Sequence, residues 1–324
     1  MNDPLTSEVL TVAAASSLMP DASAARRITV SPSMCGPGPL FFAQAGDWTW
    51  EAVGRAASLN TFQARTADGK PAYLAFSYFR TRGSTDVHPY GLTFGDELDL
   101  ESCVYGAGID SALTVHRLTP SRRSATLPAV QRLRPEELDH PEPGCLYVET
   151  FNRWLSRREG GSNQKLLTSI PVGFDHSVLP PLPENCSPRA TVAAVRQEGL
   201  FPPVPGFRRT EPDFRTRYRV DAARDLNGAG LLYFASYFSI VDTAMLQLWT
   251  HLGRSEQAFL GRHLLDHQIC YFANADPGTQ LDLTVGLWGS GTDAREEVAD
   301  VVLRDAGSGR LVAVASVRLR VPEV

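Results

Sequence analysis

Cys35-Gly-Pro-Gly-Pro-Leu-Phe-Phe-Ala43 and Asn227-Gly-Ala-Gly-Leu-Leu-Tyr-Phe-Ala235 are two copies of one pattern. Both carry glycine, glycine, leucine, phenylalanine and alanine in the same places, 192 positions apart. A second pair follows in the same order, Gly95-Asp-Glu-Leu-Asp-Leu100 and Gly278-Thr-Gln-Leu-Asp-Leu283, 183 positions apart. Two ordered matches at nearly one spacing indicate an internal duplication, so the 324 residues predict two related units.

Each copy is followed by an apolar segment and then by a run of short strands. Asp47 and Ser239 occupy matching positions before apolar residues, and we expect them to be the N-caps of two central helices. Gly253 is expected to end the second helix. The strands are expected at residues 27–30, 72–82, 98–105, 111–118 and 146–156, and then at 215–222, 267–274, 281–288, 298–304 and 311–321.

One apolar helix followed by antiparallel strands predicts an α+β unit in which a sheet wraps around the helix. This is the layout of a hot-dog domain, and two copies predict a double hot dog. The units are expected at residues 26–157 and 212–324, packed side by side in one continuous sheet, because a lone sheet leaves an open edge. Residues 158–211 are polar and proline-rich and are interpreted as a connector, and residues 1–25 as a flexible arm.

Composition excludes several classes of protein. A net charge of -5 argues against a nucleic-acid-binding protein, and the absence of a long apolar run argues against a membrane-spanning one. Five scattered cysteines without a CxxC pair argue against a disulfide framework and a structural zinc site. A cytoplasmic protein is therefore expected, and its oligomeric state stays open.

Several long strings resemble one enzyme family. They are Thr29-Val-Ser-Pro-Ser-Met-Cys-Gly-Pro-Gly-Pro-Leu-Phe41, Gly46-Asp-Trp-Thr-Trp-Glu-Ala-Val53, Ala72-Tyr-Leu-Ala-Phe-Ser-Tyr-Phe-Arg80, Leu146-Tyr-Val-Glu-Thr-Phe-Asn-Arg-Trp154 and Asp225-Leu-Asn-Gly-Ala-Gly-Leu-Leu-Tyr-Phe-Ala-Ser236. They are similar to the bifunctional acyltransferase/decarboxylases of leinamycin-type polyketide biosynthesis, from about Thr29 to the C-terminus. The resemblance implies a double hot dog that takes methylmalonyl-CoA, transfers the acyl group through a tyrosine, decarboxylates it, and delivers propionyl to a phosphopantetheinylated acyl carrier protein. It implies no metal and no other cofactor.

The resemblance places the catalytic tyrosine in the strand that holds Tyr73 and Tyr78, and we favour Tyr73. The two residues are an odd number of positions apart, so regular alternation predicts that they point to opposite faces and that only one faces the site. On composition alone, Tyr73 in an apolar strand is more often a core aromatic residue whose hydroxyl is hydrogen-bonded.

Decarboxylation of a malonyl thioester needs donors for the developing oxyanion, and helix N-termini supply them. The expected helix starts lie near residues 46–48 and 238–240, so the substrate is expected near Gly46, Asp47, Trp48 and Ser239. Asp242, at the start of the second helix, either faces this cleft or is favoured there by the helix dipole.

Polar residues of the loops have two interpretations each. Asp225 precedes the second glycine-rich turn with Asn227, and it is interpreted either as a catalytic carboxylate or as a turn residue. Ser162 and Asn163 follow Gly160-Gly161, and they form either a turn or a loop that folds over a thioester. Cys35, His88 and His267 are weaker candidates, because buried residues of these types usually only pack.

Arginine is dense in one segment, at positions 208, 209, 215, 217 and 219. These side chains either protect a solvated edge strand or capture the phosphates of CoA or an acidic carrier protein. Two other functions compete with the leading one. A hot-dog thioesterase acting on acyl-CoA or acyl-carrier thioesters would use Asp225, and a non-catalytic module would bind a carrier protein or an acyl chain. A dehydratase is disfavoured because neither glycine-rich turn contains a histidine.

Overall fold

The computed structural model describes residues 17–18, 23–121, 133, 137, 140–157, 161–183 and 186–322. Its strands form one antiparallel sheet in the order β1-β2-β4-β5-β6-β3-β10-β13-β12-β11-β8, with β7 on β6 and β9 on β11. The strands are β1 (Ser17–Leu18), β2 (Ser23–Thr29), β3 (Ala72–Arg82), β4 (Glu97–Gly106), β5 (Ser111–Pro120), β6 (Leu146–Arg157), β7 (Leu166–Thr168), β8 (Phe207–Arg209), β9 (Phe214–Arg219), β10 (His263–Tyr271), β11 (Gln280–Ser290), β12 (Glu296–Asp305) and β13 (Leu311–Arg320). The α-helices are α1 (Leu40–Ala56), α2 (Arg189–Glu198), α3 (Ser236–His251) and α4 (Glu256–Leu260).

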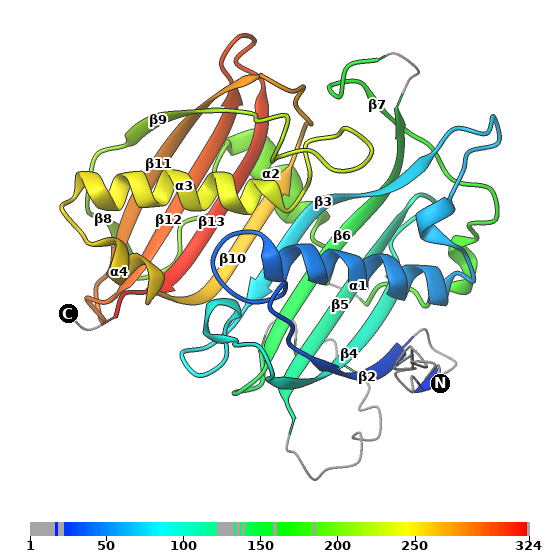
Figure 1. Cartoon of the computed structure of the whole chain (residues 1–324), viewed down its shortest axis with the longest axis horizontal. Helices are drawn as coiled ribbons and strands as arrows, with labels where there is room; N and C mark the ends of the chain where they lie inside the picture. The colour runs from blue at the N-terminus through cyan, green and yellow to red at the C-terminus, as the bar shows by residue number, and fades with distance from the viewer. Residues whose placement is uncertain are drawn as a thin grey trace, which may run out of the picture.

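The long helices α1 and α3 lie across one face of this sheet, one over each half (Figure 1). We call it the helix face, and the opposite side the outer face. A sheet wrapped around one helix, repeated twice, is the α+β double hot dog that the repeat predicts. The two halves meet where β3 pairs with β10, residues 78–82 against 266–270, so the sheet is continuous as predicted.

The central helices begin earlier than the sequence suggests. The N-cap of α1 is Pro39, and Asp47 lies well inside the helix, so the prediction that Asp47 is an N-cap is wrong. The same holds for Ser239, because α3 begins at Ser236. The reason is hydrophobic: the first turn of α1 buries Phe42, whose ring stacks on Phe238 with centroids 3.8 Å apart. Burial of these rings outweighs a capping hydrogen bond of about 1 kcal/mol.

The end of α3 matches its prediction. Gly253 follows the C-cap with φ 72°, a left-handed conformation that favours glycine.

The connector contains a helix that was not predicted. α2 follows Ser187-Pro188 and ends at Gly199, whose φ is 76°. Its Val195 is fully buried and joins a cluster with Tyr78, Phe151 and Phe201 on the outer face. This packing places α2 beside the junction of the two halves.

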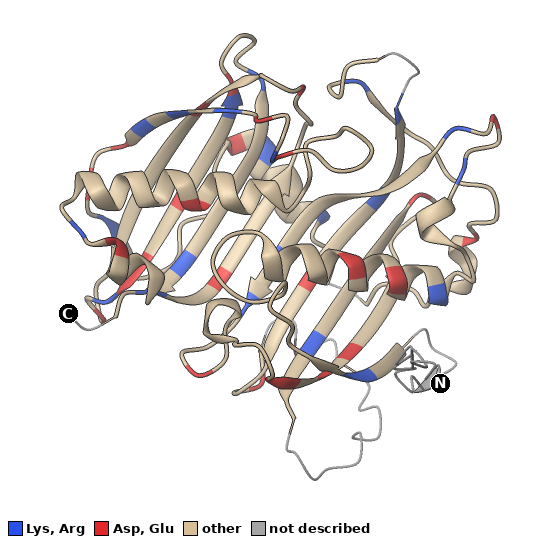
Figure 2. Ribbon diagram, in the orientation of Figure 1, with Lys and Arg blue, Asp and Glu red and all other residues tan. Residues whose placement is uncertain are grey.

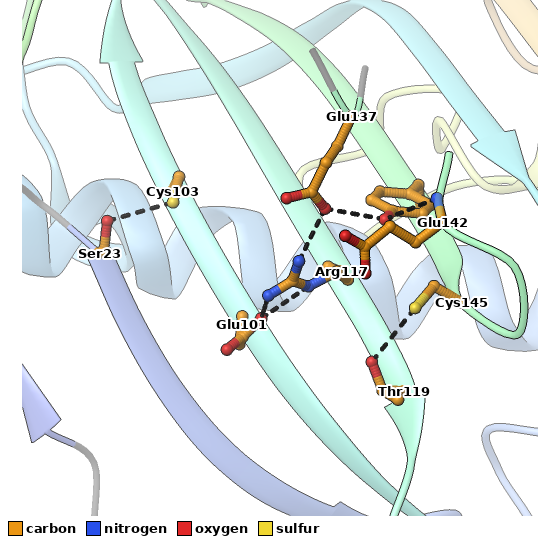
Figure 3. A network of polar contacts seen from close by, with 9 residues as sticks. Ser23, Glu101, Cys103, Arg117, Thr119, Glu137, Glu142 and Cys145 are labelled. Atoms are coloured by element: carbon orange, nitrogen blue, oxygen red, sulfur yellow. Dashed lines mark hydrogen bonds and ion pairs between the residues drawn. The ribbon is translucent and has the colours of Figure 1, made fainter. Parts of the chain in front are cut away.

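A buried polar network stabilises the outer face of the first half (Figure 3). The Arg117 guanidinium pairs with Glu101 and, at 2.7 Å, with Glu137. Tyr147 donates a 2.9 Å hydrogen bond to Glu137. Because all these side chains are buried, each charge depends on its partners.

The two central helices differ in charge, because α1 carries Asp47, Glu51 and Arg55. α3 carries one acidic residue, Asp242, and no lysine or arginine (Figure 2). Among the described residues, no helix is both long enough and apolar enough to cross a membrane.

Candidate functional site

A cavity of about 1100 Å³ lies where the pairing between the two halves of the sheet ends. β10 pairs only with residues 78–82 of β3, so residues 72–77 have no β10 partner along that edge. The cavity wall is built from α1, β3, β6, α2, the loop before α3 and the chain after β10. Residues of both sheet faces line it, because it opens beside the unpaired half of β3.

Tyr73 lines this cavity and Tyr78 does not. Tyr73 is partly buried, and its hydroxyl has no hydrogen-bond partner among the described residues. Tyr78 is 3 % exposed and donates a 2.9 Å hydrogen bond to Oε1 of Gln268. Burial, with the nearby Glu149 carboxylate, raises the pKa of Tyr78 well above its ordinary value.

The prediction that the two tyrosines point to opposite faces is wrong. A β-bulge between Phe76 and Tyr78 adds one residue to β3, so Leu74 pairs with Trp154 and Tyr78 with Phe151. Leu74 packs with the α1 cluster and Tyr78 with the α2 cluster, which leaves Tyr73 and Tyr78 both on the outer face. Tyr73 and Tyr78 therefore differ in burial because of their positions along the strand, and not because they point to different faces.

The helix-face wall of the cavity comes from the middle of α1. An added Cβ at Gly46 would lie 2.2 Å from Cζ of Phe234, so only glycine lets the loop before α3 approach α1 this closely. Asp47 is an exposed residue of the cavity lining, and partial desolvation, with Glu51 one turn away, raises its pKa. Burial and the Asp47 charge raise the pKa of Tyr233, another wall residue, to about 12.

Asn163 and Asn227 hold the loops of the site in place. Asn227 Oδ1 accepts hydrogen bonds from the backbone N–H groups of Ala229 and Leu231 and thereby shapes the glycine-rich turn. Asn163 is 3 % exposed and donates 2.7 Å and 3.2 Å hydrogen bonds to the carbonyls of Gly230 and Ala275. Both asparagines line the cavity, and through Asn163 the connector contributes to its wall.

Ser162 supports Asn163 from outside the wall. Its hydroxyl donates a 2.5 Å hydrogen bond to Asp276, which also accepts the N–H of Asn163. The Gly-Gly-Ser-Asn segment is thus tied to the chain after β10.

Besides Tyr78 and Ser162, four further predicted site residues lie away from the cavity lining. Trp48 is 3 % exposed in the core, and Ser239 lies on α3 close to Gly38. Asp242 forms a 2.8 Å ion pair with Arg262 and accepts a hydrogen bond from the Tyr90 hydroxyl. These residues pack the interior of the helix layer.

Asp225 is the fourth, and its contacts favour the turn interpretation. It is 1 % exposed and accepts hydrogen bonds from the Tyr218 hydroxyl at 2.9 Å and from the N–H of Asp221 at 2.7 Å. The expected oxyanion donors also differ from the prediction, because residues 46–48 lie in the middle of α1 and residues 238–240 are the third to fifth residues of α3. The N–H of Phe238 already donates to the Ala235 carbonyl, which is a correction to the predicted site.

The weaker candidates also lie outside the lining. Cys35 bonds the Ser31 carbonyl, His88 stacks on His263 with centroids 4.7 Å apart, and His267 is fully buried. Arginines 208 and 209 lie on β8, and 215, 217 and 219 on β9, both paired with β11 at the far edge of the sheet. This position supports the edge-protection interpretation of those arginines.

The cavity has its own arginines, which the sequence did not single out. They are Arg153, Arg189, Arg196 and Arg310. Arg153 pairs with Asp110 at 2.7 Å, and Arg310 donates a 3.1 Å hydrogen bond to the Asn274 carbonyl. The Nε of Arg310 is buried and has no hydrogen-bond partner in the described part of the chain. Only the fold could identify these residues, because they come from three separate segments.

Comparison with known proteins identifies the family. The family model described as the LnmK N-terminal hot dog fold domain matches residues 25–203, more than half of the chain. The chain belongs to the LnmK hot-dog family. This LnmK-type match includes β3, α1 and the α2 connector, and so it covers Tyr73, Asn163 and three of the cavity arginines.

Solved structures show the same double hot-dog architecture at low sequence identity. The 12:0-ACP thioesterase from Umbellularia californica is 12 % identical with a TM-score of 0.55, covering 94 % of this chain and 96 % of that one. An acyl-ACP thioesterase from Bacteroides thetaiotaomicron is 11 % identical with a TM-score of 0.53, covering 94 % of this chain and 100 % of that one. At such identities the likeness shows the fold alone. A search of curated protein sequences finds no significant match.

Proposed function

We propose that this protein is an acyltransferase/decarboxylase that converts methylmalonyl-CoA to propionyl-acyl carrier protein through an acyl ester on Tyr73. One observation carries the proposal: Tyr73 lines a cavity of about 1100 Å³, and its hydroxyl has no hydrogen-bond partner among the described residues. Membership of the LnmK family and the resemblance of the Tyr73 strand support the same chemistry. The acyl-thioester class of the substrate is supported further by the acyl-ACP thioesterases that share the fold.

The reaction divides into three steps. The Tyr73 oxygen attacks the thioester carbonyl, the phenolic proton leaves, and CoA departs as the thiol. The C–CO2 bond then breaks, and its electron pair forms an enolate that takes a proton at carbon 2. Finally, the thiol of the carrier's pantetheine arm attacks the ester, which releases propionyl-carrier and restores the Tyr73 hydroxyl.

The surroundings of Tyr73 suit these steps. Phe76, Phe234 and Tyr237 supply an apolar wall, which limits hydrolysis of an ester intermediate and favours loss of a carboxylate as neutral CO2. The Arg310 guanidinium also lines the cavity, and its positive charge would stabilise negative charge that develops on the carbonyl oxygen. We assign no metal or other cofactor to these steps.

The test is an assay with methylmalonyl-CoA and a cognate carrier protein that bears its pantetheine arm. Mass spectrometry of the carrier should find propionyl-carrier. Methylmalonyl-carrier that persists, or free propionate alone, would contradict the proposal.

A hot-dog thioesterase is the second candidate, and one observation favours it. Asp47, a carboxylate of raised pKa, lies on the cavity wall, where it could serve as a general base for water. Asp225 gives this candidate no support, because its carboxylate is engaged outside the lining. Thiol release from acyl-CoA that is independent of carrier protein, and that is lost in Asp47→Asn, would favour the thioesterase. A module that only binds carrier or acyl chain would show tight thioester binding without turnover.

A further inference from the structure

The cavity wall is positively charged although the protein as a whole is acidic. Arg153, Arg189, Arg196 and Arg310 line it against two carboxylates, Asp47 and Asp110, while the whole chain has a net charge of -5. Asp110 is neutralised by Arg153. The surplus of positive charge therefore belongs to the arginines of α2 and to Arg310.

The α2 arginines are held over aromatic rings at the cavity. The guanidinium of Arg196 lies over the ring of Phe272, 4.8 Å from its centroid, and that of Arg189 over Phe151 at 5.5 Å. Arg196 has neither an ion pair nor a hydrogen bond with any described residue. Among the described residues, the Arg189 guanidinium donates only to the Ala107 carbonyl. The cation–π contacts hold each guanidinium near its ring and leave N–H groups for an anion.

Helix α2 is a firm support for these two side chains. Val195, next to Arg196, is fully buried in the outer-face cluster, and Gly199 ends the helix one turn later. Val192 and Ala193, which lie between the two arginines in sequence, also line the cavity. Tyr73 lies on the same outer face of the sheet and lines the same cavity as the two arginines.

We propose that Arg189 and Arg196 form a binding site for the phosphate at the end of a pantetheine arm. The inference rests on the proposed function for the thioester end of that arm at Tyr73. A guanidinium matches a phosphate with parallel N–H donors, and exposed arginines at a cavity mouth attract phosphate from solution. The arm ends in a phosphate ester both in CoA and on a carrier protein, so the two sources share this chemistry.

Calorimetric titration of the full-length protein tests the site without any turnover. The ligands are CoA, which carries three phosphates, and pantetheine, which carries none. Arg196→Gln and the double variant Arg189→Gln/Arg196→Gln are compared with Arg215→Gln, which removes an exposed arginine on β9 far from the cavity. Retained circular dichroism and thermal unfolding show that each variant is folded.

The site predicts that Kd for CoA rises roughly 10–100-fold for each arginine lost, the range for hydrogen bonds to a charged group. Arg215→Gln should leave the Kd for CoA unchanged, and the affinity for pantetheine should be equal in all variants. The affinity of the native protein for CoA should also fall with added salt. An unchanged Kd for CoA in the double variant, or equal losses for CoA and pantetheine, would overturn the proposal.

Steady-state kinetics then separate the two sources of phosphate. A rise in KM for methylmalonyl-CoA alone assigns the site to CoA, and a rise for the carrier protein alone assigns it to the carrier. A rise for both shows that both arms use it in turn, and a rise for neither overturns the site. If the native protein binds CoA through Arg196 but produces no propionyl-carrier, the proposed function fails while the phosphate site stands.

Discussion

Tyr73 and Tyr78 make a matched pair for mutation, because they share one strand, one face and one chemistry but differ in their contacts. Tyr73→Phe removes a cavity hydroxyl that has no partner among the described residues, so it should cost less than about 0.5 kcal/mol of unfolding free energy. Tyr78→Phe removes a buried 2.9 Å hydrogen bond and leaves Gln268 unpaired. It should cost about 1–2 kcal/mol.

Activity should show the opposite order. Loss of a covalent nucleophile lowers kcat by roughly three to six orders of magnitude in enzymes where it has been measured, and we expect Tyr73→Phe to fall in that range. Tyr78→Phe should keep kcat within about threefold, since its hydroxyl lies outside the cavity lining. Urea unfolding gives the stability of each variant, and carrier acylation followed by mass spectrometry gives kcat. Near-normal transfer by Tyr73→Phe, with transfer abolished in Tyr78→Phe, would refute the assignment.

Three further predictions concern stability and cavity shape. Burial lowers the pKa of both His116 and His267 to about 3, below the unfolded value of 6.5, so their stabilising effect is complete above pH 6.5 and declines as the pH falls. His267→Phe should therefore reduce the pH dependence of the unfolding free energy between pH 6 and 4 by about 1.4 kcal/mol per pH unit. Urea titrations at several pH values measure this slope, and an unchanged slope would contradict a neutral, buried His267 ring. Arg117→Met removes the cation from two buried carboxylates and should cost about 3–5 kcal/mol in urea unfolding; a cost below 1 kcal/mol would show that the network is dispensable. Gly46→Ala pushes a Cβ to 2.2 Å from the Phe234 ring and should raise KM for the thioester while costing about 1–3 kcal/mol, and unchanged kinetics would separate this ring from the site.

Much of the fold could be predicted because its signals are local. The strand 72–82 has the predicted bounds, since its alternation and its turn-forming neighbours both lie in the sequence. The start of α1 could not be predicted from capping residues, because the burial of Phe42 against Phe238 is a contact across 196 positions of the chain. Local rules predicted that the helix begins at Asp47, whereas the contact between Phe42 and Phe238 extends it toward the N-terminus as far as Leu40.

The site was predictable only in part, for the same physical reason. Tyr73 could be named from the family resemblance, and Gly46 and Asp47 from the expected start of the first helix, and all three line the cavity. The bulge in β3 reversed the expected face of one tyrosine, and nothing in the Ala-Phe-Ser-Tyr sequence marks an inserted residue. α2 could have been found from Pro188 and Gly199, but its role at the cavity depends on how the connector folds back over the outer face.

The most direct test of the central claim is to look for the acyl-enzyme. The protein is incubated with methylmalonyl-CoA without carrier protein, quenched in acid and digested, and the peptide that contains Tyr73 is analysed by tandem mass spectrometry. Our account predicts one propionyl or methylmalonyl group on the Tyr73 oxygen, removed by later addition of the carrier protein and absent from Tyr73→Phe. An unmodified Tyr73 peptide while CoA is released and propionyl-carrier still forms, or an acyl group on another residue, would contradict it.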